Sequence, residues 1–257
     1  MIMNKLLALI SLVAILAGCG ADRGIEDVGK IVGGEPAPRG QYPFFAALVD
    51  EDGEHICGGA LIAPQWVLTA AHCLTNPEIK AHTVSIGLEQ YRPEVIEKER
   101  ITVGDVFLHA GLNRGQYDIA LVKLSRPAQS TEFLKLDSGQ SPLPLYKNTP
   151  VTLIGFGRTD EGVLADVLYQ GQGRILNDAR CIYIPEGYPD TNFNPDNNIC
   201  AGYNQAGGDS GGPLLYKTAS GYVEVGLVSR TLMYGAGQYT RVSFFDGWIR
   251  QIMQTNP

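Results

Sequence analysis

The chain has 257 residues, a formal net charge of −7 and 18% charged residues. It carries no cluster of Lys and Arg and no stripe of alternating aromatic and basic residues, which argues against nucleic acid as a partner. Its 31 glycines and 15 prolines interrupt short apolar runs, which favours an all-β protein with many turns over one built of long helices.

The amino terminus has the pattern of an export signal. Lys5 precedes a mostly apolar stretch from Leu6 to Ala17, which is too short for a bilayer span of about twenty residues. The run Leu16-Ala17-Gly18-Cys19 then resembles the lipobox of bacterial lipoproteins, in which cleavage before the cysteine leaves it carrying lipid. We expect residues 1–18 to be a signal peptide and Cys19 to be lipidated; the alternative is a generic signal peptide with an incidental cysteine.

Two segments present one polar side chain each at the edge of a core. In Trp66-Val67-Leu68-Thr69-Ala70-Ala71-His72-Cys73 an apolar strand leads into a turn of small residues that ends on an imidazole. In Asp118-Ile119-Ala120-Leu121-Val122-Lys123-Leu124 an acid opens an apolar run. Alone, such a histidine is usually structural or on the surface, and such an aspartate is usually a turn former.

The most informative run is Gly207-Gly208-Asp209-Ser210-Gly211-Gly212-Pro213. Glycines allow a tight turn that can point the Ser210 hydroxyl outward, with the N–H groups of Gly208 and Ser210 converging where an oxyanion could lie. Taken alone, a Gly-rich Asp-Ser loop is more often a plain surface turn. With His72 as the base and Asp118 orienting its imidazole, the same serine becomes the nucleophile of an acyl-transfer site.

The chain order His72, Asp118, Ser210 resembles that of the trypsin/chymotrypsin-like serine proteases and differs from that of subtilisins and α/β-hydrolases. The resemblance extends over most of the chain from Ile31, through the runs Ile31-Val32-Gly33-Gly34, His55-Ile56-Cys57-Gly58-Gly59-Ala60-Leu61-Ile62, Val228-Ser229, Tyr239-Thr240-Arg241-Val242 and Trp248-Ile249.

This resemblance implies one protease domain over residues 31–257. Its fold would be all-β: two packed six-stranded antiparallel β-barrels, catalytic residues from both sides of the cleft, and a short C-terminal helix around Phe244 to Met253. We expect a monomer without cofactor. We also expect no catalytic metal, because no His, Cys and Asp cluster has metal-ligand spacing, and we interpret His82 and His109 as structural or surface residues.

The same resemblance implies two disulfides among the five cysteines, Cys57–Cys73 and Cys181–Cys200. The oxidising environment of an exported protein permits both bridges. Cys19 is then the odd cysteine, for which lipidation gives a reason.

The resemblance also implies activation by proteolysis. A buried Asp209 would need a positive partner, and cleavage of Lys30–Ile31 would supply the α-amino group of Ile31. Residues 19–30 would be a lipid-tethered pro-segment that holds the precursor at a membrane, in the outer membrane or periplasm, until an activating protease cuts. His55 matches the histidine that holds this aspartate away in family zymogens, or is a half-exposed strand histidine.

Departures from the family pattern lie around the specificity pocket. Asn204 stands where trypsins place a carboxylate, and Ser229 is followed by Arg230 and Thr231 instead of Trp-Gly. Gly237 matches the glycine that keeps the pocket open. Ser229 itself resembles the serine that hydrogen-bonds the buried aspartate, or is an ordinary strand serine. Without an acid in the pocket, we expect uncharged side chains of small to medium size before the cleaved bond.

These observations predict a serine endopeptidase, made as an exported zymogen, that acts on proteins or peptides through an acyl-enzyme. Two alternatives remain open. One is a protease homologue that has lost turnover and holds a partner through its cleft. The other is an esterase that uses the same three residues.

Overall fold

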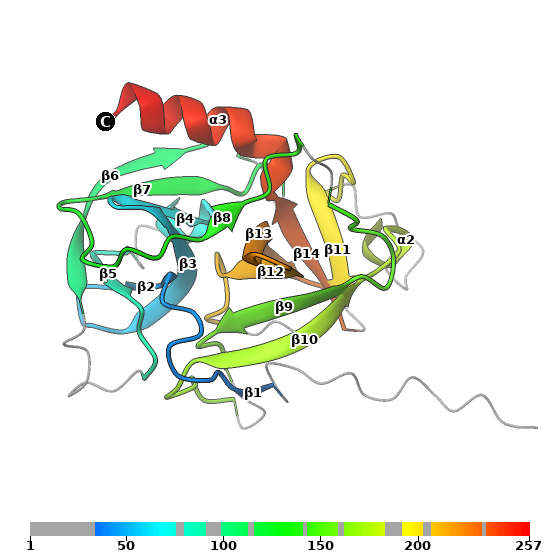
Figure 1. Cartoon of the computed structure of the whole chain (residues 1–257), viewed down its shortest axis with the longest axis horizontal. Helices are drawn as coiled ribbons and strands as arrows, with labels where there is room; N and C mark the ends of the chain where they lie inside the picture. The colour runs from blue at the N-terminus through cyan, green and yellow to red at the C-terminus, as the bar shows by residue number, and fades with distance from the viewer. Residues whose placement is uncertain are drawn as a thin grey trace, which may run out of the picture.

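The computed structural model describes residues 34–75, 80–90, 99–112, 116–140, 143–158, 162–182, 192–202, 207–232 and 235–257. These residues form two β-barrels side by side, with one helix lying across the top of the view in Figure 1. No helix in the described part of the chain is long and apolar enough to cross a bilayer.

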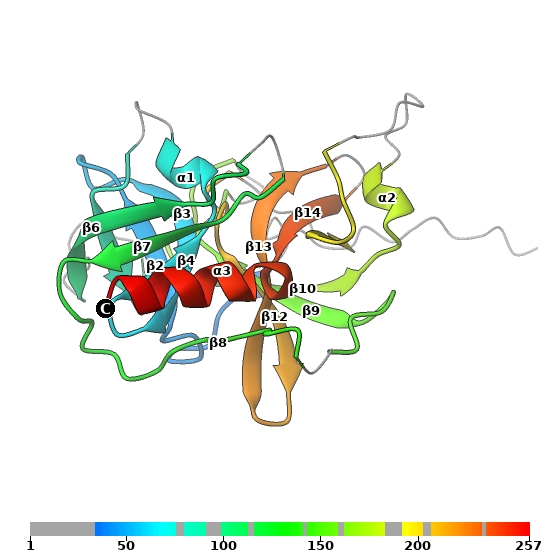
Figure 2. The same cartoon turned by 90° about the horizontal axis from the view of Figure 1, so that it is seen from above.

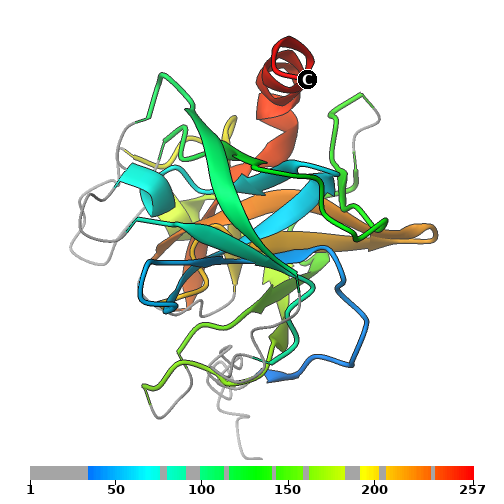
Figure 3. The same ribbon diagram turned by 90° about the vertical axis from the view of Figure 1, so that its left-hand side faces the viewer.

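The first barrel is a closed antiparallel ring in the order β2-β3-β4-β7-β6-β5. Short apolar runs such as Phe45-Ala-Ala-Leu-Val49 are buried over their whole length, because both faces of the strand meet apolar neighbours. Figure 3 views the molecule from the side of this barrel. Its strands are β2 (Phe45–Val49), β3 (His55–Ala63), β4 (Trp66–Thr69), β5 (Thr83–Ile86), β6 (Arg100–Leu108) and β7 (Ala120–Leu124).

The second barrel is also a closed antiparallel ring, in the order β9-β10-β11-β14-β13-β12. Pairing of β12 with β9, through Leu214 with Leu153 and Leu215 with Thr152, closes it. The expectation of two packed six-stranded antiparallel barrels is therefore confirmed. The strands are β9 (Pro150–Gly155), β10 (Tyr169–Ile175), β11 (Asn198–Gly202), β12 (Pro213–Thr218), β13 (Gly221–Thr231) and β14 (Ala236–Arg241).

Three short elements join the barrels to each other. The two-residue strand β1 (Glu35–Pro36), from the start of the described chain, pairs with β10, and β8 (Lys135–Leu136) pairs in parallel with β13. Figure 2 shows α3 (Val242–Thr255), the predicted C-terminal helix, crossing from the second barrel over the first. Its buried face packs with residues of both barrels, among them Leu68, Leu121 and Leu227.

Both disulfides expected from the resemblance are present, and each fastens a short helix. Cys57–Cys73 ties β3 to α1 (His72–Thr75), and Cys181–Cys200 ties α2 (Ala179–Ile182) to β11. By constraining the unfolded chain, a disulfide of this kind typically contributes about 2–4 kcal/mol. The first one also holds the start of α1, where His72 lies.

Candidate active site

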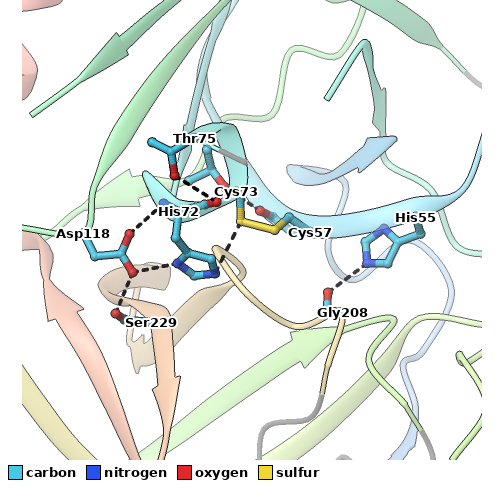
Figure 4. Close-up of a disulfide and its surroundings, with 10 residues drawn as sticks. His55, Cys57, His72, Cys73, Thr75, Asp118, Gly208 and Ser229 are labelled. Carbon is cyan, nitrogen blue, oxygen red and sulfur yellow. Dashed lines mark hydrogen bonds and ion pairs between the residues drawn. A yellow bond between two sulfur atoms is a disulfide. The ribbon is translucent and has the colours of Figure 1, made fainter. Parts of the chain in front are cut away.

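His72 and Asp118 meet at the seam between the barrels, where β4 leads into α1 and where the chain enters β7 (Figure 4). The Nδ1 atom of His72 lies 2.7 Å from Oδ2 of Asp118, and the backbone N–H of His72 donates to Oδ1 at 2.9 Å. Because a carboxylate only accepts, Nδ1 carries the proton in this pair. The second nitrogen, Nε2, is then a proton acceptor, as a general base requires.

The carboxylate of Asp118 is buried and held by further donors. Ser229 Oγ donates to Oδ2 at 2.6 Å, and Thr240 Oγ1 donates to the Asp118 carbonyl at 2.9 Å. Burial by itself raises the pKa of Asp118, but the hydrogen bonds and charge of His72 and the bond from Ser229 together hold that pKa below its usual value. Asp118 is therefore ionised at neutral pH and stabilises a positive charge on His72.

The imidazole of His72 is buried only on its Asp118 side. Its side chain keeps 40% exposure, against 4% for Asp118. The ring edge that carries Nε2 lies 3.9 Å from the sulfur of Cys73 in the Cys57–Cys73 bridge. Among the described residues, Cys57, His72 and Cys73 are the one group of three possible metal ligands that come together, but both sulfurs are in the disulfide and offer no thiolate to a metal.

The loop around Ser210 runs between β11 and β12 and is fixed by contacts with both barrels. Gly58 of β3 donates its N–H to the Ser210 carbonyl at 2.7 Å, and Gly211 donates to the Val228 carbonyl at 2.8 Å. Gly208 adopts φ +103°, a conformation that other residues rarely reach. Among the described residues, no backbone carbonyl accepts a hydrogen bond from the N–H groups of Gly208 and Ser210.

Asp209, the neighbour of Ser210, is fully buried and turned towards the second barrel. Gly157 donates its N–H to Oδ1 of Asp209 at 2.9 Å. A Cβ at either Gly155 or Gly157 would overlap the Asp209 carboxylate, so the space for this side chain exists because both positions are glycine. These two glycines were not predicted as part of the site, since nothing local to them marks the approach of a carboxylate about fifty residues later in the chain.

His55, in β3 of the first barrel, contacts the Ser210 loop through Gly208. Its Nε2 lies 2.9 Å from the carbonyl oxygen of Gly208, so this nitrogen carries the proton (Figure 4). Burial lowers the pKa of His55 to about 4, against the opposing effect of this hydrogen bond. His55 is thus a neutral, buried donor at physiological pH rather than a half-exposed strand histidine.

The remaining predicted residues are distributed as follows. Ser229 is buried and contacts Asp118; Thr231, at the end of β13, is exposed; Gly237 is buried in β14. Four predicted residues lie outside the described part of the chain: Cys19, Lys30, Ile31 and Asn204. The predicted lipid site, the cleavage site and one pocket position therefore have no structural description. Thr240, which donates to the Asp118 carbonyl, was not predicted as a site residue, although it lies in a run that matches the family.

Two barrels with a His–Asp pair and a Gly-Asp-Ser-Gly loop at their seam define the class of chymotrypsin-like hydrolases. A family model named Trypsin matches residues 31–249, and the chain belongs to this family of serine-type peptidases. It is similar to a solved structure described as the secreted serine protease VesC from Vibrio cholerae, at 28% identity and a TM-score of 0.73. The match covers 85% of this chain and 47% of that one, so this chain spans about half the length of VesC.

Proposed function

We propose that the chain is a serine endopeptidase with Ser210 as nucleophile, His72 as general base and acid, and Asp118 as the group that orients the imidazole. The observation that carries the proposal is the 2.7 Å pairing of His72 Nδ1 with the ionised Asp118, which leaves Nε2 as the acceptor. The pair lies beside a loop whose Gly208 and Ser210 N–H groups donate to no backbone carbonyl among the described residues.

The proposed chemistry uses these three residues in turn. Ser210 Oγ attacks the carbonyl carbon of the substrate while its proton passes to His72 Nε2, and the negative oxygen accepts hydrogen bonds from Gly208 and Ser210. The C–N bond then breaks, and His72 returns the proton to the leaving amine. Water repeats the sequence on the acyl-enzyme, with His72 again as base, and releases the acid and free Ser210.

We further propose that cleavage after Lys30 activates the enzyme. A buried carboxylate needs a positive partner, and the α-amino group of a newly exposed Ile31 would supply one for Asp209. The burial of the Asp209 carboxylate against Gly155 and Gly157 supports this role, because it fixes the carboxylate in one place inside the second barrel, where an inserted amino group would meet it.

Residues 19–30, before the cleavage site, would determine where the precursor is held. With lipid on Cys19 the precursor would be exported and held at a membrane, in the outer membrane or periplasm, and the description of VesC as secreted supports export. No cysteine lies between Gly20 and Lys30, so no disulfide could retain the segment after cleavage. Activation by another protease would therefore release the domain of residues 31–257 from its lipid.

The pocket would select uncharged side chains of small to medium size, because Asn204, Ser229, Thr231 and Gly237 supply no negative charge. Peptides with Ala, Leu, Phe, Arg or Lys before the cleaved bond, compared side by side, test this preference. A tenfold advantage for Arg or Lys would contradict it.

The proposed function is tested with protein that starts at Ile31 after cleavage at Lys30. A fluorophosphonate probe should label the wild type, and the Ser210→Ala variant should lose both labelling and peptide hydrolysis to below about a hundredth of the wild-type rate. Ser220→Ala, which changes an exposed turn serine, is the matched control. Failure of the wild type to react would favour a binding protein, and turnover of small esters without any peptide cleavage would favour an esterase.

A further inference from the structure

Tyr117, the residue before Asp118, has a backbone conformation that its side chain disfavours. Its φ is +54°, in the left-handed region, and among the described residues the only other non-glycine residue with positive φ is Asn148, at +72°. Asparagine tolerates this region because its short polar side chain can bond locally, whereas a bulky aromatic residue there is an outlier that its surroundings must stabilise. Such outliers concentrate at functional sites.

The surroundings of the Tyr117 ring are aromatic on several sides. The ring of His109 stacks on it almost in parallel, with centroids 5.1 Å apart and an interplanar angle of 15°. Phe245 of α3 meets both rings edge-on, at 5.8 Å from Tyr117 and 5.2 Å from His109. Two more rings of the same helix complete the cluster, Phe244 at 6.1 Å from Tyr117 and Trp248 at 5.4 Å from His109.

The stack is also fixed by the backbone next to it. Gly111 donates its N–H to His109 Nδ1 at 3.1 Å, and a Cβ at Gly111 would lie 3.2 Å from the Tyr117 ring and 3.3 Å from His109. Nδ1 is therefore an acceptor, and burial lowers the pKa of His109, which favours this neutral state. Gly111 thus packs closely against both rings of the stack.

The position of this ring bears directly on Asp118. The Tyr117 carbonyl accepts the N–H of Ile119 at 2.9 Å, which bends the chain at Asp118. Beyond that bend, the Asp118 carbonyl is held by Thr240 and its carboxylate by His72 and Ser229. Any change in the Tyr117 backbone rotates the peptide group that enters Asp118, and with it the direction of the carboxylate.

We propose that Tyr117 is a positioning residue: the stack of its ring on His109 and against α3 holds its backbone in the left-handed region and thereby aims the Asp118 carboxylate at His72. In this way the C-terminal helix supports the catalytic pair through the Tyr117 ring. The proposal rests on the proteolytic function proposed above for its kinetic consequence, but the geometry it explains can be measured without turnover.

The test compares Tyr117→Ala and His109→Ala, which remove either half of the stack, with Tyr117→Phe, which keeps the ring. Because Asp118 remains but is misdirected, the two alanine variants should lower kcat by about tenfold with KM within about twofold of wild type. Tyr117→Phe should recover kcat to within about twofold, since the contacts with His109, Phe244 and Phe245 are made by the ring. Asn148→Ala is the matched control, because it alters a positive-φ residue on an exposed turn before β9.

A second readout is the proton NMR signal of the His72 Nδ1–H, which moves downfield in a short, charge-assisted hydrogen bond. It should shift upfield or broaden in both alanine variants and stay in place in Tyr117→Phe and Asn148→Ala. Unchanged kcat and an unchanged signal in Tyr117→Ala would overturn the proposal, as would equal losses in Asn148→Ala. If the wild type cleaves no peptide, the proposed function fails, while the NMR signal still decides whether Tyr117 positions Asp118.

Discussion

Ser229 donates a hydrogen bond to the same oxygen of Asp118 that His72 uses, at 2.6 Å from Oδ2. One oxygen from the first barrel is thus shared by a donor from each barrel. The bond from Ser229 contributes to the lowered pKa of Asp118 and prevents the carboxylate from turning away from the imidazole.

Replacing Ser229 with alanine should therefore lower kcat/KM by about tenfold, because a hydrogen bond to a charged group typically contributes about 1.5–3 kcal/mol. Ser85→Ala is the control: Ser85 is also buried, and its Oγ has no partner among the described residues. Kinetics of the activated proteins on one peptide substrate measure both. Equal losses in the two variants would show that a buried hydroxyl matters only for packing.

Gly157→Ala should abolish activity, since the new Cβ would overlap the Asp209 carboxylate and displace the loop that carries Ser210. Gly247→Ala is the matched change in α3, where a Cβ meets nothing within 4 Å. That variant should keep full activity and gain about 0.5–1 kcal/mol of stability from the better helix former. Fluorophosphonate labelling measures the activity of both variants, and thermal unfolding measures their stability. Labelling of Gly157→Ala at the wild-type rate would contradict the prediction.

His55 should make the protein less stable in acid. The pKa of His55 is lowered to about 4 in the folded state, while the unfolded chain takes up this proton near its ordinary value of 6.5. As the pH falls from 6.5 to 4, His55 binds a proton in the unfolded state but not in the folded state. The free energy of unfolding therefore drops by about 3 kcal/mol and then levels off.

The variant His55→Gln isolates this effect, because glutamine can still donate to the Gly208 carbonyl but does not titrate. Urea unfolding at pH 7 and pH 4 should show a smaller loss of stability in acid for His55→Gln than for wild type. His82→Gln, which removes an exposed imidazole, serves as control. The same loss in wild type and in His55→Gln would refute the assignment.

Glu224 in β13 is a buried acid that the proposed catalysis does not use. It is fully buried, and neither carboxylate oxygen has a hydrogen-bond partner among the described residues. Burial raises its pKa well above the ordinary value, so the folded state keeps a proton that the unfolded state releases above about pH 4.5. Stability is therefore lost as the pH rises from that value towards the folded pKa.

Glu224→Leu should stabilise the protein by about 1–3 kcal/mol at pH 7, because an unpaired polar group leaves the core. The gain should be smaller at pH 5. Urea unfolding at the two pH values measures it, with the exposed-loop change Glu51→Leu as control. A destabilised Glu224→Leu protein at pH 7 would mean that the carboxyl group has a structural partner.

The three candidate catalytic residues could be predicted because each lies in a short run with strong local chemistry, and the barrels and disulfide pairs were predicted through the family resemblance that these runs carry. The roles of Ser210, His72 and Asp118 in turnover stay predictions. The space for Asp209 was not predictable, since it depends on two glycines of another strand region. Glu224 lies in the run Tyr222-Val223-Glu224-Val225, whose alternation suggests a polar side chain facing solvent; β8 pairs along this part of β13 and helps to cover it.

The packing of elements from each half of the chain against the other barrel also determines how the protein unfolds. β1 and β8 lie along strands of the second barrel, and α3 covers residues of the first, so each half of the chain completes the core of the other. Neither half can melt without exposing apolar surface on its neighbour. Heating should therefore give one cooperative transition, and a chain cut at the exposed Gln140 should yield two fragments that become structured only when mixed.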